Sequence, residues 1–117
     1  MSLREVQTSI SVTTQFPALH RWKDAPEEVK FLRHWHRHMF KVKATFKVTH
    51  SDRDLEFFII QNKLRDFVTQ WMDEKVEKSC EMFASEILGY FLRHNLPCWM
   101  VEVSEDGENE AVVQVAQ

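Results

Sequence analysis

The stretch HWHRHMFKVKATFKV, residues 34–48, alternates between two kinds of side chain. From position 36 the even-numbered positions carry His, His, Phe, Val, Ala, Phe and Val, whereas the odd-numbered ones carry Arg, Met, Lys and Thr. A period of two is typical of a β-strand with one apolar, buried face and one basic, exposed face. His36 and His38 therefore stand where Phe or Val is expected, and a bound metal ion is the obvious reason for imidazoles there.

A second alternating run, residues 10–20, ends in another histidine on its apolar face, His20. Pro17 places this run at a sheet edge or at the end of its strand, because proline has no N–H to donate. If the two strands pair antiparallel, the end of the first lies beside the start of the second. His20 then meets His36 and His38 at one end of the sheet and on one face.

Three neutral imidazoles that converge beside the long connection 21–33 predict an open zinc site, with a fourth position left for water or substrate. Two other interpretations stay open. A core-facing histidine can be a hydrogen-bonded structural residue, and His36 and His38 could be exposed at a frayed strand start. His34 shares their parity and could replace one of the three.

The remaining chain predicts two helices and two further strands. After a turn at 50–54 and a short extended piece at 55–60, the expected elements are helices at about 61–73 and 79–94 and strands at 98–105 and 110–116. Ser79 is a good N-cap for the second helix. The order ββααββ predicts an α+β fold, in which two helices pack on one face of a four-stranded antiparallel sheet.

Two residues outside the histidine group bear on a site. Trp99, Val101, Val103 and Glu105 share one parity in the strand at 98–105, so Glu105 ends an apolar face. A carboxylate there either turns into solvent or receives a cationic or amide-rich ligand. Cys80 falls on the buried stripe of the second helix and is expected to be a small core residue rather than a nucleophile.

Composition limits the classes of function. The 117 residues suit a single domain, 1–117, with a polar and flexible N-terminus at 1–8. The net charge of −3 gives no general attraction to nucleic acid or membranes, and no apolar run is long enough to span a bilayer. Two glycines cannot build a glycine-rich phosphate loop. Two cysteines outside any CxxC are typical of thiols in a reducing cytoplasm, so a cytoplasmic location is expected.

Four short motifs carry a resemblance to a known family. The sequence has FPALH at 16–20 where the family has F-x-A-x-H, and HRHMF at 36–40 where it has H-G-H-x-[FY]. It has SCEMFA at 79–84 for [ST]-[ST]-E-x-x-A, and VEVSED at 101–106 for V-x-V-x-E-[TD]. In this order and spacing the chain resembles the 6-pyruvoyl-tetrahydropterin synthase family, which includes the 6-carboxy-tetrahydropterin synthases of queuosine biosynthesis.

The resemblance implies a T-fold, whose sheets join between subunits into a barrel, commonly as trimers paired into hexamers. It implies that His20, His36 and His38 hold Zn²⁺, that Glu105 anchors a pterin, and that Glu81 supports that pocket or a neighbouring subunit's ligand. In the family's lyase reaction, zinc polarises the side chain of dihydroneopterin triphosphate, while a cysteine base and an Asp–His pair move protons and triphosphate is eliminated.

The sequence departs from the family where the proton transfers occur. Residues 31–33 are Phe-Leu-Arg where the family's cysteine lies, Arg37 replaces the glycine of HGH, and the connection 71–79 is too short for the Asp–His stretch. The catalytic residues therefore stay unassigned, with the possible substitutes His34, His50, Asp52, His94 or a partner subunit. The expected function is a zinc protein acting on dihydroneopterin triphosphate or a related pterin with degenerate acid–base residues. The alternatives are a non-catalytic T-fold protein that binds a pterin- or purine-like ligand or serves as an oligomeric scaffold, and a small interaction domain without metal.

Overall fold

The computed structural model describes residues 6–116, and it contains one antiparallel sheet in the order β1-β2-β3-β4. The elements follow the predicted order ββααββ, with two short 3-10 helices added. Their bounds are β1 Thr8–His20, η1 Glu27–Arg33, β2 His36–Val48, α1 Phe57–Val68, η2 Thr69–Trp71, α2 Cys80–Arg93, β3 Cys98–Glu105 and β4 Asn109–Gln114. Most of the predicted flexible N-terminus, 1–8, lies outside the described residues, and β1 begins at Thr8.

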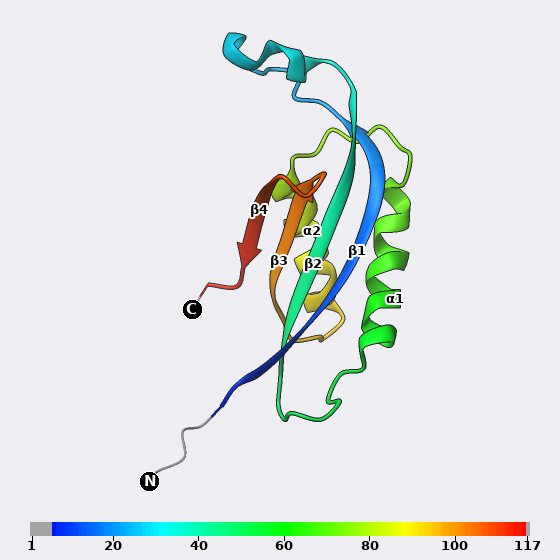
Figure 1. Cartoon of the computed structure of the whole chain (residues 1–117), viewed down its shortest axis with the longest axis vertical. Coiled ribbons are helices and arrows are strands. Elements are labelled where there is room, and N and C mark those ends of the chain that lie inside the picture. The colour runs from blue at the N-terminus through cyan, green and yellow to red at the C-terminus, as the bar shows by residue number, and fades with distance from the viewer. Residues whose placement is uncertain (1–5, 117) are drawn as a thin grey trace.

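Both long helices cover the same face of the sheet, which confirms the predicted α+β architecture. Helix α1 packs along β1, and α2 packs on β3 and β4, with two of its phenylalanine rings against those of β2 (Figure 1). The alternation of β2 explains this arrangement, because Phe40, Val42, Ala44 and Phe46 are at most 2% exposed and form the sheet side of the core. An aromatic cluster around Phe16 fills the space between sheet and helices.

The start of α1 differs from the prediction. The segment from Leu55 to Ile60 was expected to be extended because it is apolar and rich in residues that favour strands. Instead α1 begins at Phe57, since the Glu56 side chain accepts a hydrogen bond from the backbone N–H of Ile59 and caps the first turn. The prediction for α2 is confirmed, and its N-cap Ser79 accepts a hydrogen bond from the N–H of Met82 at 3.2 Å.

The face assigned to Trp99 was wrong. Thr45 pairs with Met100, but Phe46 pairs with Cys98, so Trp99 is an extra residue in a β-bulge. The bulge sends Cys98 into the core, where it is 2% exposed. The Trp99 ring lies against Lys47 on the polar face instead, with 5.1 Å between the ammonium and the ring centroid.

The edge of β1 near its C-terminal end is covered by the segment between the two helices. The Pro17 carbonyl accepts a hydrogen bond from Asp73, and Leu19 exchanges backbone bonds with Glu74 and Val76 at 2.9 and 2.8 Å. Pro17 therefore stands on an edge strand, as its missing N–H predicts. This contact brings the N-terminal end of α2 beside the end of β1.

The connection between β1 and β2 contains the 3-10 helix η1 and extends beyond the end of the sheet (Figure 1). It was predicted only as a long loop. Among residues 6–116, no helix combines the length and the apolar character needed to cross a membrane.

Candidate metal centre

The pairing of β1 with β2 brings the three predicted histidines together. His20 is the register partner of His36, and Ala18 is the partner of His38, so all three imidazoles lie on one face at one end of the sheet. Their ring centroids are 4.5 to 5.2 Å apart, and one ring nitrogen of each lies within 4.8 Å of the other two. The convergence predicted from strand parity is confirmed.

Backbone carbonyls fix the orientation of two of these rings. The Nδ1 of His20 lies 2.9 Å from the carbonyl oxygen of Lys78, and the Nδ1 of His36 lies 2.8 Å from that of His34. A carbonyl oxygen only accepts, so each Nδ1 carries the proton and donates it. In the neutral ring the lone pair is then on Nε2, and both Nε2 atoms are buried without a hydrogen-bond partner.

A carboxylate orients the third ring. The Nδ1 of His38 donates to Oδ2 of Asp106 at 2.7 Å, and Oδ1 of the same carboxylate accepts from the backbone N–H of Met39 at 2.8 Å. The pKa of Asp106 is lowered, chiefly by its hydrogen bond with His38 and then by that with Met39. Metal-binding histidines commonly donate their second nitrogen to a carbonyl or carboxylate in this way.

The charge state of His20 suits a metal ligand. Burial lowers the pKa of His20 below 6.5, against the opposing effects of its hydrogen bond to the Lys78 carbonyl and of the nearby Glu105 carboxylate. The ring is therefore neutral near pH 7, as coordination through Nε2 requires.

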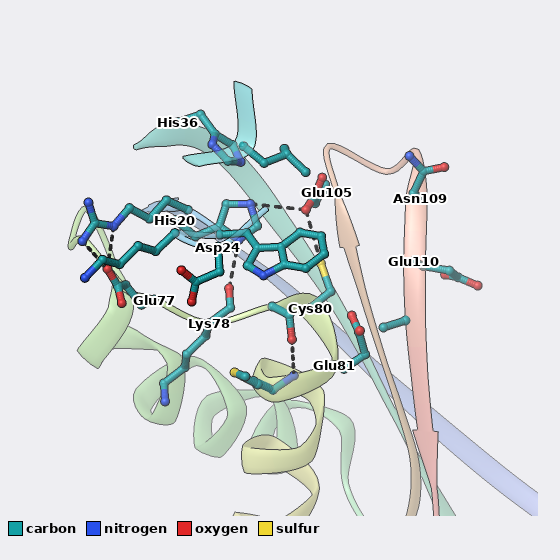
Figure 2. Close-up of a pocket in the computed structure, with 17 residues that line it drawn as sticks. His20, Asp24, His36, Glu77, Lys78, Cys80, Glu81, Glu105, Asn109 and Glu110 are labelled. Carbon is teal, nitrogen blue, oxygen red and sulfur yellow. Dashed lines mark hydrogen bonds and ion pairs between the residues drawn. The ribbon is translucent and has the colours of Figure 1, made fainter. Parts of the chain in front are cut away.

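Glu105 faces the Nε2 atoms of two histidines. Its Oε1 lies 3.3 Å from Nε2 of His20, and its Oε2 lies 3.5 Å from Nε2 of His38 (Figure 2 shows the first contact). Where these rings are neutral with the proton on Nδ1, a lone pair points at the carboxylate, and a metal ion or a second proton on the ring makes that contact favourable. The donor set thus fits a divalent metal ion held by three imidazoles, with Glu105 beside it.

A cavity of about 550 Å³ opens from the histidines along the N-terminal end of α2. Its lining includes Glu105 and Glu81, the two residues predicted to bind ligand, and also His20 and His36 (Figure 2). Glu81 lies in the first turn of α2, and Glu105 is the last residue of β3. The structure brings both carboxylates to one cavity next to the metal-ligand candidates.

Cys80 also lines this cavity, although it is only 8% exposed. Its Sγ lies 4.0 Å from Oε1 of Glu105. Burial, followed by repulsion from Glu105 and Glu81, raises the pKa of the Cys80 thiol to about 12. The thiol therefore stays protonated at neutral pH, in agreement with its interpretation as a core residue rather than a nucleophile.

Both cysteines are expected to resist alkylation in the folded protein. Burial raises the pKa of Cys98 to about 11, so neither thiol supplies the reactive thiolate at pH 8. Mass spectrometry after treatment with iodoacetamide should find unmodified native protein, and two modified cysteines after treatment in denaturant. Rapid modification of native Cys80 would contradict the assigned protonation state.

The proposed substitutes for the missing acid–base residues lie elsewhere. His34 is exposed and contributes its backbone carbonyl to the site, through the bond to His36. His50 and Asp52 follow the C-terminal end of β2, at the end of the sheet opposite the histidine group. His94 follows α2 and precedes the start of β3, and this start of β3 pairs with the C-terminal end of β2. Within one chain these three residues cannot reach the histidine group.

Asp106 is a candidate site residue that the sequence did not single out. It was noted only as the last letter of the motif at 101–106. The register could have revealed it: Phe40 pairs with Glu105, so the next residue along β3 continues toward Met39 and His38. Asp106 adopts a positive φ of 55° at the turn into β4, which directs the chain back and leaves its carboxylate beside His38.

Comparison with known proteins supports the fold. No protein-family model and no curated protein sequence matches the chain. Among solved structures, the 6-pyruvoyl tetrahydropterin synthase of Caenorhabditis elegans matches with a TM-score of 0.75 and 12% identity over 98% of this chain and 100% of its own. The Plasmodium falciparum synthase gives 0.68 and 14% over 93% and 98%, and an uncharacterized protein of Wolinella succinogenes gives 0.75 and 15% over 94% and 99%.

The chain therefore has the T-fold of the 6-pyruvoyl tetrahydropterin synthases, which confirms the resemblance drawn from its motifs at the level of the fold. These identities of 12 to 15% show the fold alone.

Proposed function

We propose that this chain acts as a single domain that binds one zinc ion through His20, His36 and His38 and a pterin-like heterocycle beside it. One observation supports the proposal: three Nδ1 atoms are committed to oxygen acceptors, which leaves the three neighbouring Nε2 atoms as the ring nitrogens available to a metal ion. Zinc takes neutral imidazole nitrogens in open sites of this kind. When bound, zinc would act as a Lewis acid toward a hydroxyl or carbonyl oxygen of the ligand.

Glu105 and Glu81 are the proposed ligand-binding residues. The Glu105 carboxylate lines the cavity, where it can accept hydrogen bonds from the ring N–H and amino groups of a heterocycle. Glu81 lies in the first turn of α2 and lines the same cavity. The proposed assembly is a homo-oligomer of the kind that the T-fold resemblance implies, with no nucleic acid or membrane partner.

Catalytic turnover is a separate question from binding. A zinc-dependent lyase needs a base, and the cysteine beside the site holds its proton because its pKa is raised to about 12. That observation favours a second candidate function, in which the T-fold binds a pterin- or purine-like ligand without converting it. Steady product formation from a dihydropterin that is abolished in His36→Ala would favour a lyase over a protein that only binds its ligand.

Binding of 7,8-dihydroneopterin to zinc-loaded protein tests the proposed function. Isothermal titration calorimetry should show binding that is lost without zinc and weakened about 10- to 100-fold in Glu105→Gln, because hydrogen bonds to a charged group contribute roughly 1.5–3 kcal/mol. Glu108→Gln is the matched control, since it removes a carboxylate from an exposed turn position next to the site. An equal loss of affinity in both variants, or an affinity that is the same with and without zinc, would overturn the proposal.

Asp106→Asn is expected to weaken zinc binding by about 10- to 100-fold, as loss of an oxygen partner of a metal-binding histidine does in other sites. Asparagine keeps the size of the side chain but removes the charge that holds the His38 ring. Zinc affinity by competition with a chromophoric chelator measures the effect. Asp54→Asn is the control, because Asp54 also accepts a backbone N–H and lies near a histidine, but at the far end of the sheet. Unchanged affinity in Asp106→Asn would remove Asp106 from the site.

A further inference from the structure

The cavity beside the histidines has an excess of negative charge. Five carboxylates and three cationic side chains line it, which leaves a formal surplus of two negative charges before any metal binds. The carboxylates are those of Asp24, Glu77, Glu81, Glu105 and Glu110, and the cations are Arg21, Lys23 and Lys78. Among the described residues of one chain, a bound divalent metal ion would cancel this surplus and leave no net positive charge to balance an anionic ligand.

Two of the three cations are already paired. Arg21 donates through both Nε and Nη2 to one oxygen of Glu77 at 2.5 Å. The Lys78 ammonium lies 3.0 Å from Glu86, and its side chain points away from the imidazoles in Figure 2. Within residues 6–116, Lys23 is the one cation of the cavity lining that forms no ion pair, and it is exposed.

The N-terminus of α2 does not replace the missing cations. Helix N-termini attract anions through their free N–H groups and the helix dipole. Here the Ser79 hydroxyl already accepts from the N–H of Met82, and the Glu81 carboxylate stands in the first turn, where it uses the same positive potential. An incoming phosphate would meet this carboxylate and that of Glu105.

We infer that the site takes a heterocycle without phosphate groups and discriminates against its phosphorylated forms. This inference rests on the proposed function and narrows its ligand: the substrate class is an uncharged pterin- or purine-like ring with a short polar side chain, not a triphosphate. Like-charge contacts of this kind weaken binding, most strongly when they are poorly solvated and less when salt screens them.

The test compares 7,8-dihydroneopterin with its 3′-monophosphate and 3′-triphosphate on zinc-loaded full-length protein. Calorimetry with magnesium present to neutralise part of the phosphate charge should give at least a tenfold loss of affinity from the free alcohol to the triphosphate. The monophosphate should fall between them, and the loss should shrink at higher ionic strength. Asp24→Asn/Glu110→Gln should reduce the discrimination, whereas Glu108→Gln, outside the lining, should leave it unchanged.

Equal or tighter binding of the triphosphate would overturn the inference and leave the proposed function standing. Failure of all three compounds to bind zinc-loaded protein would overturn the proposed function, and the inference with it. Discrimination that persists unchanged in Asp24→Asn/Glu110→Gln would also contradict the inference, because the charges of the lining would then not be its cause.

Discussion

Replacing His36 with alanine is expected to weaken zinc binding by more than about 100-fold. Losing only the hydrogen-bond partner that orients a metal ligand already weakens metal binding about 10- to 100-fold, and this substitution removes the ligand itself. The Nδ1 of His36 donates to the His34 carbonyl, and its buried Nε2 has no hydrogen-bond partner, so Nε2 is available to a metal ion. Zinc affinity measured against a chelator on protein made without a histidine tag gives the result directly.

His34→Ala is the matched control for this experiment. It removes an exposed imidazole two residues earlier on the same parity but keeps the backbone carbonyl that orients His36. The zinc affinity of this variant should stay close to that of the wild type. If His34→Ala lost zinc and His36→Ala kept it, the sequence alternative in which His34 replaces one of the three ligands would be correct.

Truncation of Phe16 to alanine is expected to destabilise the fold by about 3–5 kcal/mol, the usual cost of removing a fully buried phenylalanine. Phe16 is 0% exposed, and its ring lies 5.3 to 5.5 Å from the rings of Phe40, Phe83 and Trp71. The substitution therefore opens a cavity where β1, β2, η2 and α2 meet. Urea unfolding followed by circular dichroism measures the free energy of unfolding.

Phe58→Ala serves as the comparison for Phe16→Ala. Phe58 lies in the first turn of α1 and is 70% exposed, so its removal should change the free energy of unfolding by less than about 1 kcal/mol. A large loss of stability in Phe58→Ala would mean that this exposed ring is covered in solution, for example by a second copy of the chain. A small loss in Phe16→Ala would contradict the described core.

Sequence alternation was enough to find the sheet and the histidine group. The period of two in β1 and β2 fixes which side chains share a face, and antiparallel pairing then places His20 beside His36 without further information. Helix α2 could be predicted equally well from the sequence, because its cap Ser79 and its apolar stripe are local signals.

The errors arose where longer-range contacts decide the structure. The bulge at Trp99 depends on how β3 aligns with β2, and residue alternation within one strand cannot show it. The first turn of α1 is the exception, because its contact is local: its composition is that of a strand, but the Glu56 side chain caps it through Ile59, three residues later. The role of Asp106 becomes visible only when the register between β2 and β3 is known.

The same limit applies to the chemistry of the site. Motif matching assigned ligands and a pterin anchor to single positions, but the charge of the cavity is a property of side chains from several elements. Arg21 is paired with Glu77, which lies 56 residues away in the sequence. Only the folded chain shows that this cation is committed and that the lining is acidic.

The central claim is that three Nε2 atoms hold one metal ion, and zinc-edge anomalous diffraction tests it most directly. Crystals of untagged protein grown with equimolar zinc should show one anomalous peak per chain, about 2.0–2.1 Å from the Nε2 atoms of His20, His36 and His38. Peaks only at surface sites, or ligation through Nδ1 with loss of the bonds to Lys78 and Asp106, would contradict the account.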